Sequence, residues 1–135
     1  MPESRWVVLY DGDCGFCKWL LAGLLRWDGA RRLEPVALQS AEARALLSGL
    51  SDDEQMASWH LIAPDGSRRS GGAALPQLLR QLPGGGIPAA AFARAPGMTD
   101  SGYRWVADHR SQLSKLVPAR SKRRAAARVR ERESA

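Results

Sequence analysis

Near the start of the chain, the pattern of apolar and polar residues predicts a strand followed by a helix. Residues 6–10, Trp-Val-Val-Leu-Tyr, form a short β-branched and aromatic run that is typical of a strand buried on both faces. From residue 16 to residue 27, apolar side chains recur at three- and four-residue spacing, which indicates an amphipathic helix packed on a sheet. Between the two, Gly12 permits a tight turn and Asp13 is a good N-cap for the helix.

The rest of the chain predicts further strands and several helices. Pro64, Asp65 and Gly66 lie between two strand-like runs and predict a hairpin turn. Pro35 cannot donate a ladder hydrogen bond, so its strand belongs at a sheet edge or starts irregularly. The expected strands span residues 33–38, 58–63 and 67–70, and the expected helices span residues 41–50, 73–82, 87–95 and 99–117.

This order of elements predicts an α/β, thioredoxin-like fold. A strand, a helix, a strand, a helix, two antiparallel strands and a helix follow one another, and both cysteines fall where the first strand meets the first helix. We expect a central mixed sheet of about four strands flanked by helices, with an extra C-terminal helix and a basic tail. The 135 residues suit one domain, placed at residues 1–117, with the tail at residues 118–135.

The net charge of +6 suggests a nucleic-acid binder until the charges are located. Residues 118–135 hold seven basic and two acidic side chains, so nearly all of the positive excess lies in the tail. Because the tail is also poor in large apolar residues, we expect it to be disordered or to form a solvated, marginal helix. It can bind an anionic partner weakly through charge alone, but without interleaved aromatic residues a specific nucleic-acid site is not indicated.

The two cysteines of the chain, Cys14 and Cys17, form a Cys-x-x-Cys pair at the predicted start of the first helix. Disulfide exchange needs a thiolate, and the free backbone N–H groups and the dipole at a helix N-terminus stabilise one. Cys14 takes that position, so we assign it as the nucleophile. Cys17, one turn later on the same side of the helix, is the expected resolving thiol.

Asp11 and Asp13 flank the cysteine pair and complete the candidate catalytic set. If both are ionised, they oppose a thiolate at Cys14 by like-charge repulsion, which favours a reducing or general exchange role. A partly buried carboxylate can instead relay a proton from Cys17 during resolution. Asp13 also has a structural explanation as an N-cap, and for Asp11 proton relay and turn formation both remain open.

A metal site finds little support in the sequence. Tetrahedral zinc needs four ligands, and besides the cysteines only His60 and His109 remain, without the spacing of a zinc knuckle. We expect His60 to pack in a strand or lie at the surface, and His109 with Arg110 to form a solvated or carbonyl-capping pair. The sequence therefore predicts neither a metal nor a cofactor.

Residues 10–17, Tyr-Asp-Gly-Asp-Cys-Gly-Phe-Cys, closely resemble the signature of the DCC family of predicted thiol-disulfide oxidoreductases. Further blocks that resemble this family are residues 35–40, 65–66, 72–75 and 102–110. The resemblance extends over residues 6–116, and it implies a thioredoxin-like fold and a redox role.

One position distinguishes the chain from thioredoxins and glutaredoxins, and another resembles a glutaredoxin site. Those proteins place a cis-proline before the third strand, facing the cysteines, whereas here that position falls near Ser58 or Trp59. Substrate docking is therefore expected to differ. Gly71-Gly72 falls where glutaredoxins hold the glutathione carboxylate, with Arg68 or Arg69 to assist, and the alternative is a hairpin exit that needs unhindered backbone.

The expected function is thiol-disulfide exchange with protein or small-molecule thiols and disulfides. The alternative is a non-enzymatic thioredoxin-like module that binds a partner or senses redox state, with the basic tail for docking. The first residues lack the basic segment and apolar core of a secretion signal, and no apolar run reaches the length of a membrane span. We therefore expect a cytoplasmic protein without a membrane span, and a monomer.

Overall fold

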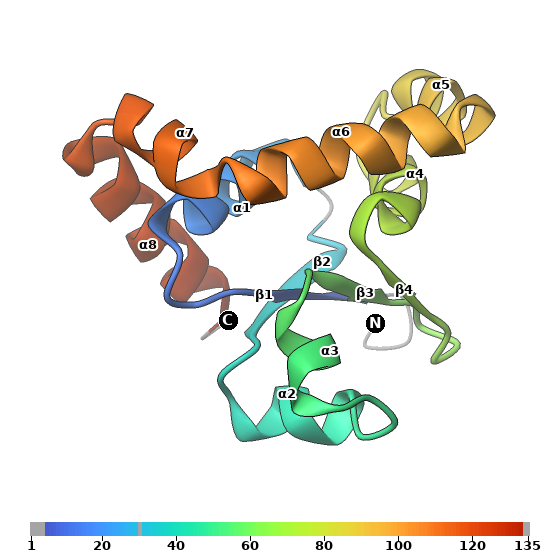
Figure 1. Ribbon diagram of the computed structural model, residues 1–135, viewed down its shortest axis with the longest axis horizontal. Helices are drawn as coiled ribbons and strands as arrows, with labels where there is room; N and C mark the ends of the chain where they lie inside the picture. Colours follow the sequence, from blue (N-terminus) through green and yellow to red (C-terminus); the bar gives the residue numbers. More distant parts are fainter. Residues whose placement is uncertain (1–4, 30, 134–135) are drawn as a thin grey trace.

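A four-stranded mixed sheet separates two unequal layers of helices (Figure 1). The computed structural model describes residues 5–29 and 31–133. The strand order is β2-β1-β3-β4, with β1 parallel to β2, and with β3 antiparallel to both β1 and β4. The strands are β1 (Trp6–Tyr10), β2 (Leu33–Ala37), β3 (His60–Ile62) and β4 (Arg68–Ser70).

Most helices lie on one face of the sheet, and two short helices lie on the other (Figure 1). The larger layer contains α1 (Gly15–Trp27), α4 (Leu75–Arg80), α5 (Gly86–Arg94), α6 (Pro96–Asp108), α7 (Arg110–Leu116) and α8 (Ala119–Glu133). The smaller layer contains α2 (Ala41–Leu46) and α3 (Asp52–Met56), and the 3-10 turn η2 (Gly71–Ala74) leads from β4 into α4. Among residues 5–29 and 31–133, no helix has the length and apolar character needed to cross a membrane.

Strand β1 is buried on both faces, as its apolar run predicts. Val8 and Tyr10 belong to the larger core cluster, together with residues of α1, α4 and α8. Leu9 belongs to the smaller cluster under α2. Because side chains alternate along a strand, one run of five residues supplies both cores and fixes the strand in the middle of the fold.

The order of elements confirms the prediction of a thioredoxin-like α/β fold. β1, α1 and β2 form a parallel crossover unit, and the β3-β4 hairpin then adds antiparallel strands on the other side of β1. Strand β2 ends the strand order, and its Pro35 lies opposite Val8 in the parallel register. The edge position predicted from Pro35 is thus confirmed, since an edge strand has one side on which a missing N–H costs nothing.

Residues 99–117, expected as one helix, are divided between α6 and α7 at His109. The His109 Nδ1–H donates to the Trp105 carbonyl at 2.7 Å, and its ring stacks on the Trp105 ring with centroids 4.4 Å apart. The backbone of His109 is no longer helical, with φ −107° and ψ 16°. The His109 backbone N–H also donates to the carbonyls of Trp105 and Val106, so its side chain caps the last turn of α6 where that helix ends. Arg110 therefore begins a new helix.

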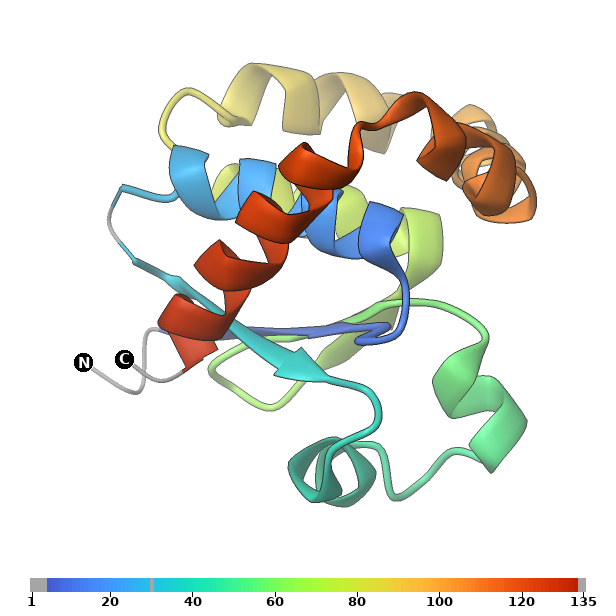
Figure 2. The same ribbon diagram turned by 90° about the vertical axis from the view of Figure 1, so that its left-hand side faces the viewer.

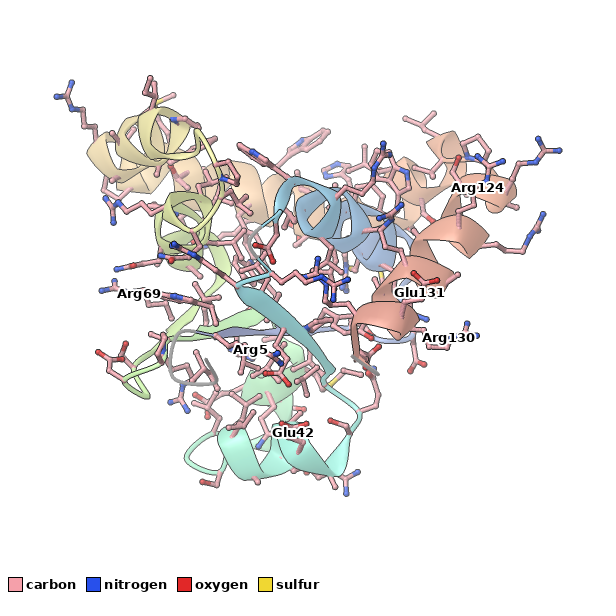
Figure 3. The ribbon with its side chains drawn as sticks, turned by 180° about the vertical axis from the view of Figure 1, so that it is seen from behind. Arg5, Glu42, Arg69, Arg124, Arg130 and Glu131 are labelled. Atoms are coloured by element: carbon pink, nitrogen blue, oxygen red, sulfur yellow. The ribbon has the colours of Figure 1, made fainter. Side chains whose placement is uncertain are left out.

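The tail was expected to be disordered or to form a solvated, marginal helix, and it contains α8, a helix that crosses over α1 (Figure 2). Ala125 and Val129 of α8 are 5% and 1% exposed and belong to the larger core cluster. Arg132 bonds the buried carboxylate of Asp28 at 2.9 Å. Two small apolar side chains and one ion pair therefore dock the helix on the core. Composition alone does not indicate this docking. The remaining arginines, such as Arg124, project from the surface (Figure 3).

Candidate active site

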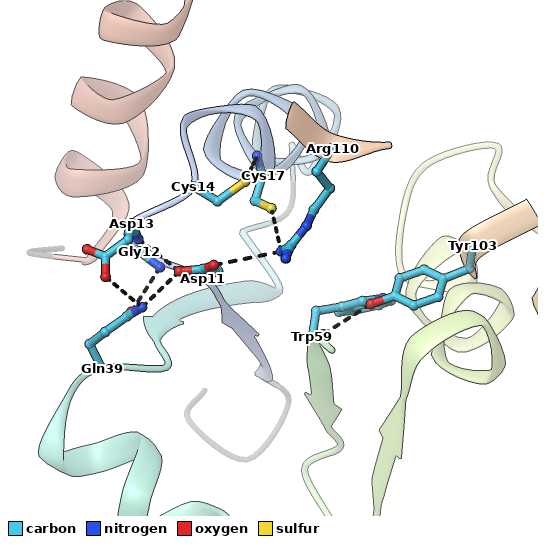
Figure 4. Close-up of polar contacts among 9 residues, drawn as sticks. All are labelled: Asp11, Gly12, Asp13, Cys14, Cys17, Gln39, Trp59, Tyr103 and Arg110. Atoms are coloured by element: carbon cyan, nitrogen blue, oxygen red, sulfur yellow. Dashed lines mark hydrogen bonds and ion pairs between the residues drawn. The ribbon is translucent and has the colours of Figure 1, made fainter. Parts of the chain in front are cut away.

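Cys14 lies at the junction of β1 and α1 and forms the N-cap of the helix (Figure 4). Its sulfur accepts a hydrogen bond from the Cys17 N–H at 3.2 Å. The predicted N-cap, Asp13, is therefore wrong by one residue, because the helix begins at Gly15 and the cysteine sulfur takes the place of the capping oxygen. A backbone N–H directed at a sulfur at a helix N-terminus stabilises negative charge there.

The two thiols have different environments. Cys14 lines an open cavity of about 450 Å³. Burial raises the pKa of Cys17 to about 12, and the hydrogen bond and charge of Cys14 act in the same direction, while Arg110 opposes them. The raised pKa favours a Cys17 thiol that stays protonated until resolution, and the assignment of Cys14 as the attacking thiol stays a prediction.

The turn before Cys14 is built around Asp11. Its Oδ1 accepts the Asp13 N–H at 3.0 Å, and its backbone carbonyl accepts the Cys14 N–H at 3.2 Å. Its Oδ2 lies 3.7 Å from Nη1 of Arg110. Asp11 thus forms the turn with one carboxylate oxygen while the other lies toward Arg110, so turn formation is confirmed and proton relay stays a prediction.

Gln39, just after β2, is a site residue that the sequence analysis did not predict. Its Oε1 accepts the Gly12 N–H at 2.9 Å, and its Nε2 donates to Asp11 at 2.8 Å and to Asp13 at 3.4 Å. A Cβ on Gly12 would lie 2.9 Å from that Oε1. Gly12 therefore permits a close approach through which Gln39 holds the loop against the neighbouring strand. Gln39 lies in the family-like block at residues 35–40, but a polar residue at a strand end is a common feature, and no contact with the cysteine loop was predicted for it.

Arg110, at the first position of α7, is the second residue that the sequence did not reveal. Its Nη1 lies 3.8 Å from the sulfur of Cys17 and 3.7 Å from the Asp11 carboxylate, between the two groups (Figure 4). It was expected to form a solvated or carbonyl-capping pair with His109. Carbonyl capping is confirmed for His109. The Arg110 side chain is solvated, as expected, with 46% of its area exposed, but its contacts with Cys17 and Asp11 were not expected.

Two elements from opposite ends of the chain enclose the cavity beside Cys14. One wall comes from the loop after β1 and the start of α1, and the other from the end of α6 and from α7. The lining residues are Asp11, Asp13, Cys14 and Gly15 on the first wall and Ala107, Asp108, Arg110, Ser111 and Ser114 on the second. All four residues of the candidate catalytic set therefore lie at or next to one cavity.

Trp59 occupies the position before β3 where thioredoxins carry a cis-proline. No cis peptide bond occurs within the part of the chain that the structure describes. The Trp59 N–H donates to the hydroxyl of Tyr103 at 3.4 Å (Figure 4), and its carbonyl accepts the Gly71 N–H at 3.1 Å. Both main-chain groups of Trp59 thus have partners within the chain.

Gly71-Gly72 matches the hairpin-exit alternative better than an anion site. A Cβ on Gly72 would lie 2.8 Å from the Cα of Asp100, and Gly71 has a φ of +61° next to the ring of Tyr103. Helix α6 covers this segment and leaves no room for a carboxylate at its backbone. Arg68 and Arg69 are exposed on β4.

His60 packs in the sheet, as predicted. It is 1% exposed, its Nε2–H donates to the Gln55 carbonyl at 2.9 Å, and its Nδ1 lies 2.6 Å from the hydroxyl of Ser70. Within residues 5–29 and 31–133, no group of three or more His, Cys, Asp or Glu side chains is arranged to hold a metal ion.

A Cys-x-x-Cys pair at the N-terminus of the first helix, on a thioredoxin-like sheet, defines a site of the thiol-disulfide oxidoreductase class. A family model described as DCC1-like thiol-disulfide oxidoreductase matches residues 8–116, and the chain belongs to this family. No curated protein and no solved structure matches the chain. The matched region includes both cysteines, both aspartates and Arg110, and it ends before α8.

Proposed function

We propose that the protein is a thiol-disulfide oxidoreductase that cycles Cys14 and Cys17 between dithiol and disulfide. The observation that carries the proposal is the 3.2 Å hydrogen bond from the Cys17 N–H to the Cys14 sulfur. With this bond the attacking sulfur lies where the helix stabilises a thiolate, beside an open cavity, with the second thiol one turn away.

In the proposed cycle, the Cys14 thiolate attacks one sulfur of a substrate disulfide. A bond forms between Cys14 and that sulfur, and the other substrate sulfur leaves as a thiolate that takes up a proton. The Cys17 thiolate then attacks the Cys14 sulfur, which closes the intramolecular disulfide and releases the second substrate thiolate. Two electrons pass from the cysteine pair to the substrate, and the reverse sequence oxidises a dithiol.

We assign Asp11 as the base that accepts the proton of Cys17. Its Oδ1 is engaged by Gln39 and by the turn, but its Oδ2 lies on the side of Arg110, which contacts the Cys17 sulfur. A base near a thiol with a raised pKa speeds its deprotonation. Asp13 is exposed at the cavity rim, and we assign it an effect on the charge around Cys14 instead.

Protein and small-molecule disulfides are both proposed substrates. A cavity of about 450 Å³ has the size of an ordinary small-ligand pocket and admits a cysteine side chain with its neighbouring groups. Because the main-chain groups of Trp59 bond to Tyr103 and Gly71, we propose that substrates dock on the cavity side chains rather than on the backbone before β3.

Catalysed reduction of an aromatic chromogenic disulfide by dithiothreitol tests the proposal. The wild-type protein should accelerate release of the coloured thiolate, and Cys14→Ser should lose that acceleration. Cys17→Ser should release one equivalent of thiolate and then stop at the mixed disulfide. A Cys14→Ser variant as active as wild type would overturn the proposal.

A further inference from the structure

We propose that Arg110 is a catalytic residue of the resolving step, where its guanidinium stabilises the thiolate of Cys17. This inference rests on the dithiol cycle proposed above and adds a residue and an order of events to it. Its basis is a geometry that joins three parts of the chain at one point: the first turn of α1, the loop after β1 and the start of α7.

The guanidinium of Arg110 lies between a thiol and a carboxylate (Figure 4). Its Nη1 is 3.8 Å from the Cys17 sulfur and 3.7 Å from Oδ2 of Asp11, and its side chain is 46% exposed. Both contacts are long for a charge-assisted hydrogen bond, so the side chain is not locked to the carboxylate. It can follow negative charge from Asp11 to Cys17.

Three titratable groups interact with the Cys17 thiol, and a fourth, Asp11, lies next to Arg110. Cys14 lies on the same helix, Arg110 comes from α7, Tyr103 from α6, and Asp11 from the preceding loop. Burial, followed by the hydrogen bond and charge of Cys14, raises the pKa of Cys17. Arg110 supplies the opposing, stabilising contribution.

The balance of these groups changes during the cycle. Before the first step, negative charge on Cys14 opposes a second charge on Cys17. Once Cys14 is bonded to the substrate sulfur, it carries no charge, while the contact of Arg110 with Cys17 persists. The cation then acts on Cys17 at the stage at which this thiol has to ionise and attack.

The size of the effect follows from the contact distance and the exposure of Arg110. An opposite charge at this range shifts a pKa by about one to three units, and half-exposure and the competition of Asp11 favour the lower end. A rise of about one unit in the pKa of Cys17 reduces its thiolate fraction at neutral pH about tenfold. The more basic thiolate is about threefold more nucleophilic, which offsets part of this loss. Loss of the Arg110 charge should therefore slow attack by Cys17 about threefold at neutral pH.

The test measures Cys17 alone, in a Cys14→Ser background, by its rate of alkylation with iodoacetamide across pH. Arg110→Met should slow alkylation about threefold at neutral pH, on the rising part of the profile. Arg110→Lys should recover most of the change, because it keeps the charge. Arg104→Met removes an exposed guanidinium from α6 that pairs with Asp100, and it should leave the profile unchanged.

A variant of Asp11 gives the opposite sign and keeps the test decisive if Arg110→Met fails to fold. Asp11→Asn retains an oxygen for the turn but releases Arg110 from the carboxylate, so the midpoint for Cys17 should fall. An unchanged profile in folded Arg110→Met, or a midpoint that does not fall in Asp11→Asn, overturns the assignment. Since alkylation needs no turnover, absence of disulfide exchange in the wild-type protein would overturn the proposed function separately.

Discussion

Arg132 of α8 donates a hydrogen bond to the carboxylate of Asp28 across 2.9 Å, although 104 residues separate them in the sequence. The Asp28 side chain has no exposed area, and it also accepts the N–H groups of Arg32 at 3.0 Å and Leu33 at 2.9 Å. The Arg132 side chain is 13% exposed. The pair therefore joins the C-terminal helix to the connection between α1 and β2, next to the core.

Arg132→Met should lower the free energy of unfolding by about 3 kcal/mol, because it leaves a buried carboxylate without its cation. Urea denaturation of the wild-type protein and of Arg132→Met measures this difference in the free energy of unfolding. Arg124→Met, which removes an exposed charge from the same helix, is the matched control and should change stability by less than about 0.5 kcal/mol. Equal losses in the two variants would contradict a specific buried ion pair.

Deletion of residues 118–135 tests whether α8 is docked on the core, in contrast to the disordered tail or solvated, marginal helix that composition predicts. Removal of α8 uncovers the core around Ala125 and Val129 and also breaks the Tyr10 hydroxyl bond to Glu133, which is 2.7 Å long. The truncated protein should be less stable than Arg132→Met in the same urea experiment. A truncated protein as stable as wild type would show that α8 does not dock.

Local sequence patterns predicted the parts of the fold that depend on local periodicity. The short continuous apolar run of β1 and the three- to four-residue spacing of α1 identify both elements, and their junction locates Cys14. The boundary was wrong by one residue, because Asp13 and Cys14 can both cap a helix and only the structure shows that Gln39 engages Asp13. Terminal residues of helices are the least predictable part of such patterns.

Arg110 and α8 could not be predicted, because their partners are distant in the sequence. The contact of Arg110 with Cys17 spans 93 residues, and that of Arg132 with Asp28 spans 104. In an arginine-rich chain, the local sequence around one arginine does not indicate which distant residue it contacts. The turn of the chain at His109, which aims Arg110 at the cysteines, lies where the His109 side chain caps the last turn of α6.

The buried His60 predicts a loss of stability in acid. Burial is the main reason that its folded-state pKa lies below the ordinary value, so the unfolded chain binds a proton more readily. Its contribution to stability is present above the unfolded pKa of about 6.5 and is lost as pH falls through the folded value. Urea denaturation at about pH 7.5 and about pH 5.5 should show a larger loss in wild type than in His60→Gln. Identical losses would contradict this role.

Gly72 and Gly102 should respond in opposite directions to replacement by alanine. A Cβ on Gly72 meets the Cα of Asp100 at 2.8 Å, so Gly72→Ala should displace α6 and cost about 1–3 kcal/mol. A Cβ on Gly102, in the interior of α6, meets nothing within 4 Å, so Gly102→Ala should stabilise the protein by about 0.5–1 kcal/mol. Thermal unfolding of both variants provides the comparison, and a stabilised Gly72→Ala would contradict the close packing of α6 on η2.

The central claim is that Cys14 attacks and Cys17 resolves, and trapping of the mixed disulfide tests it most directly. Cys17→Ser, treated with an aromatic disulfide and analysed by intact mass and peptide mapping, should hold one substrate thiol on Cys14 until dithiothreitol is added. Cys14→Ser, under the same treatment, should react much more slowly, because burial, the largest cause of the raised pKa of Cys17, remains in this variant. Faster labelling of Cys17 than of Cys14, or no adduct on Cys14, would contradict the assignment.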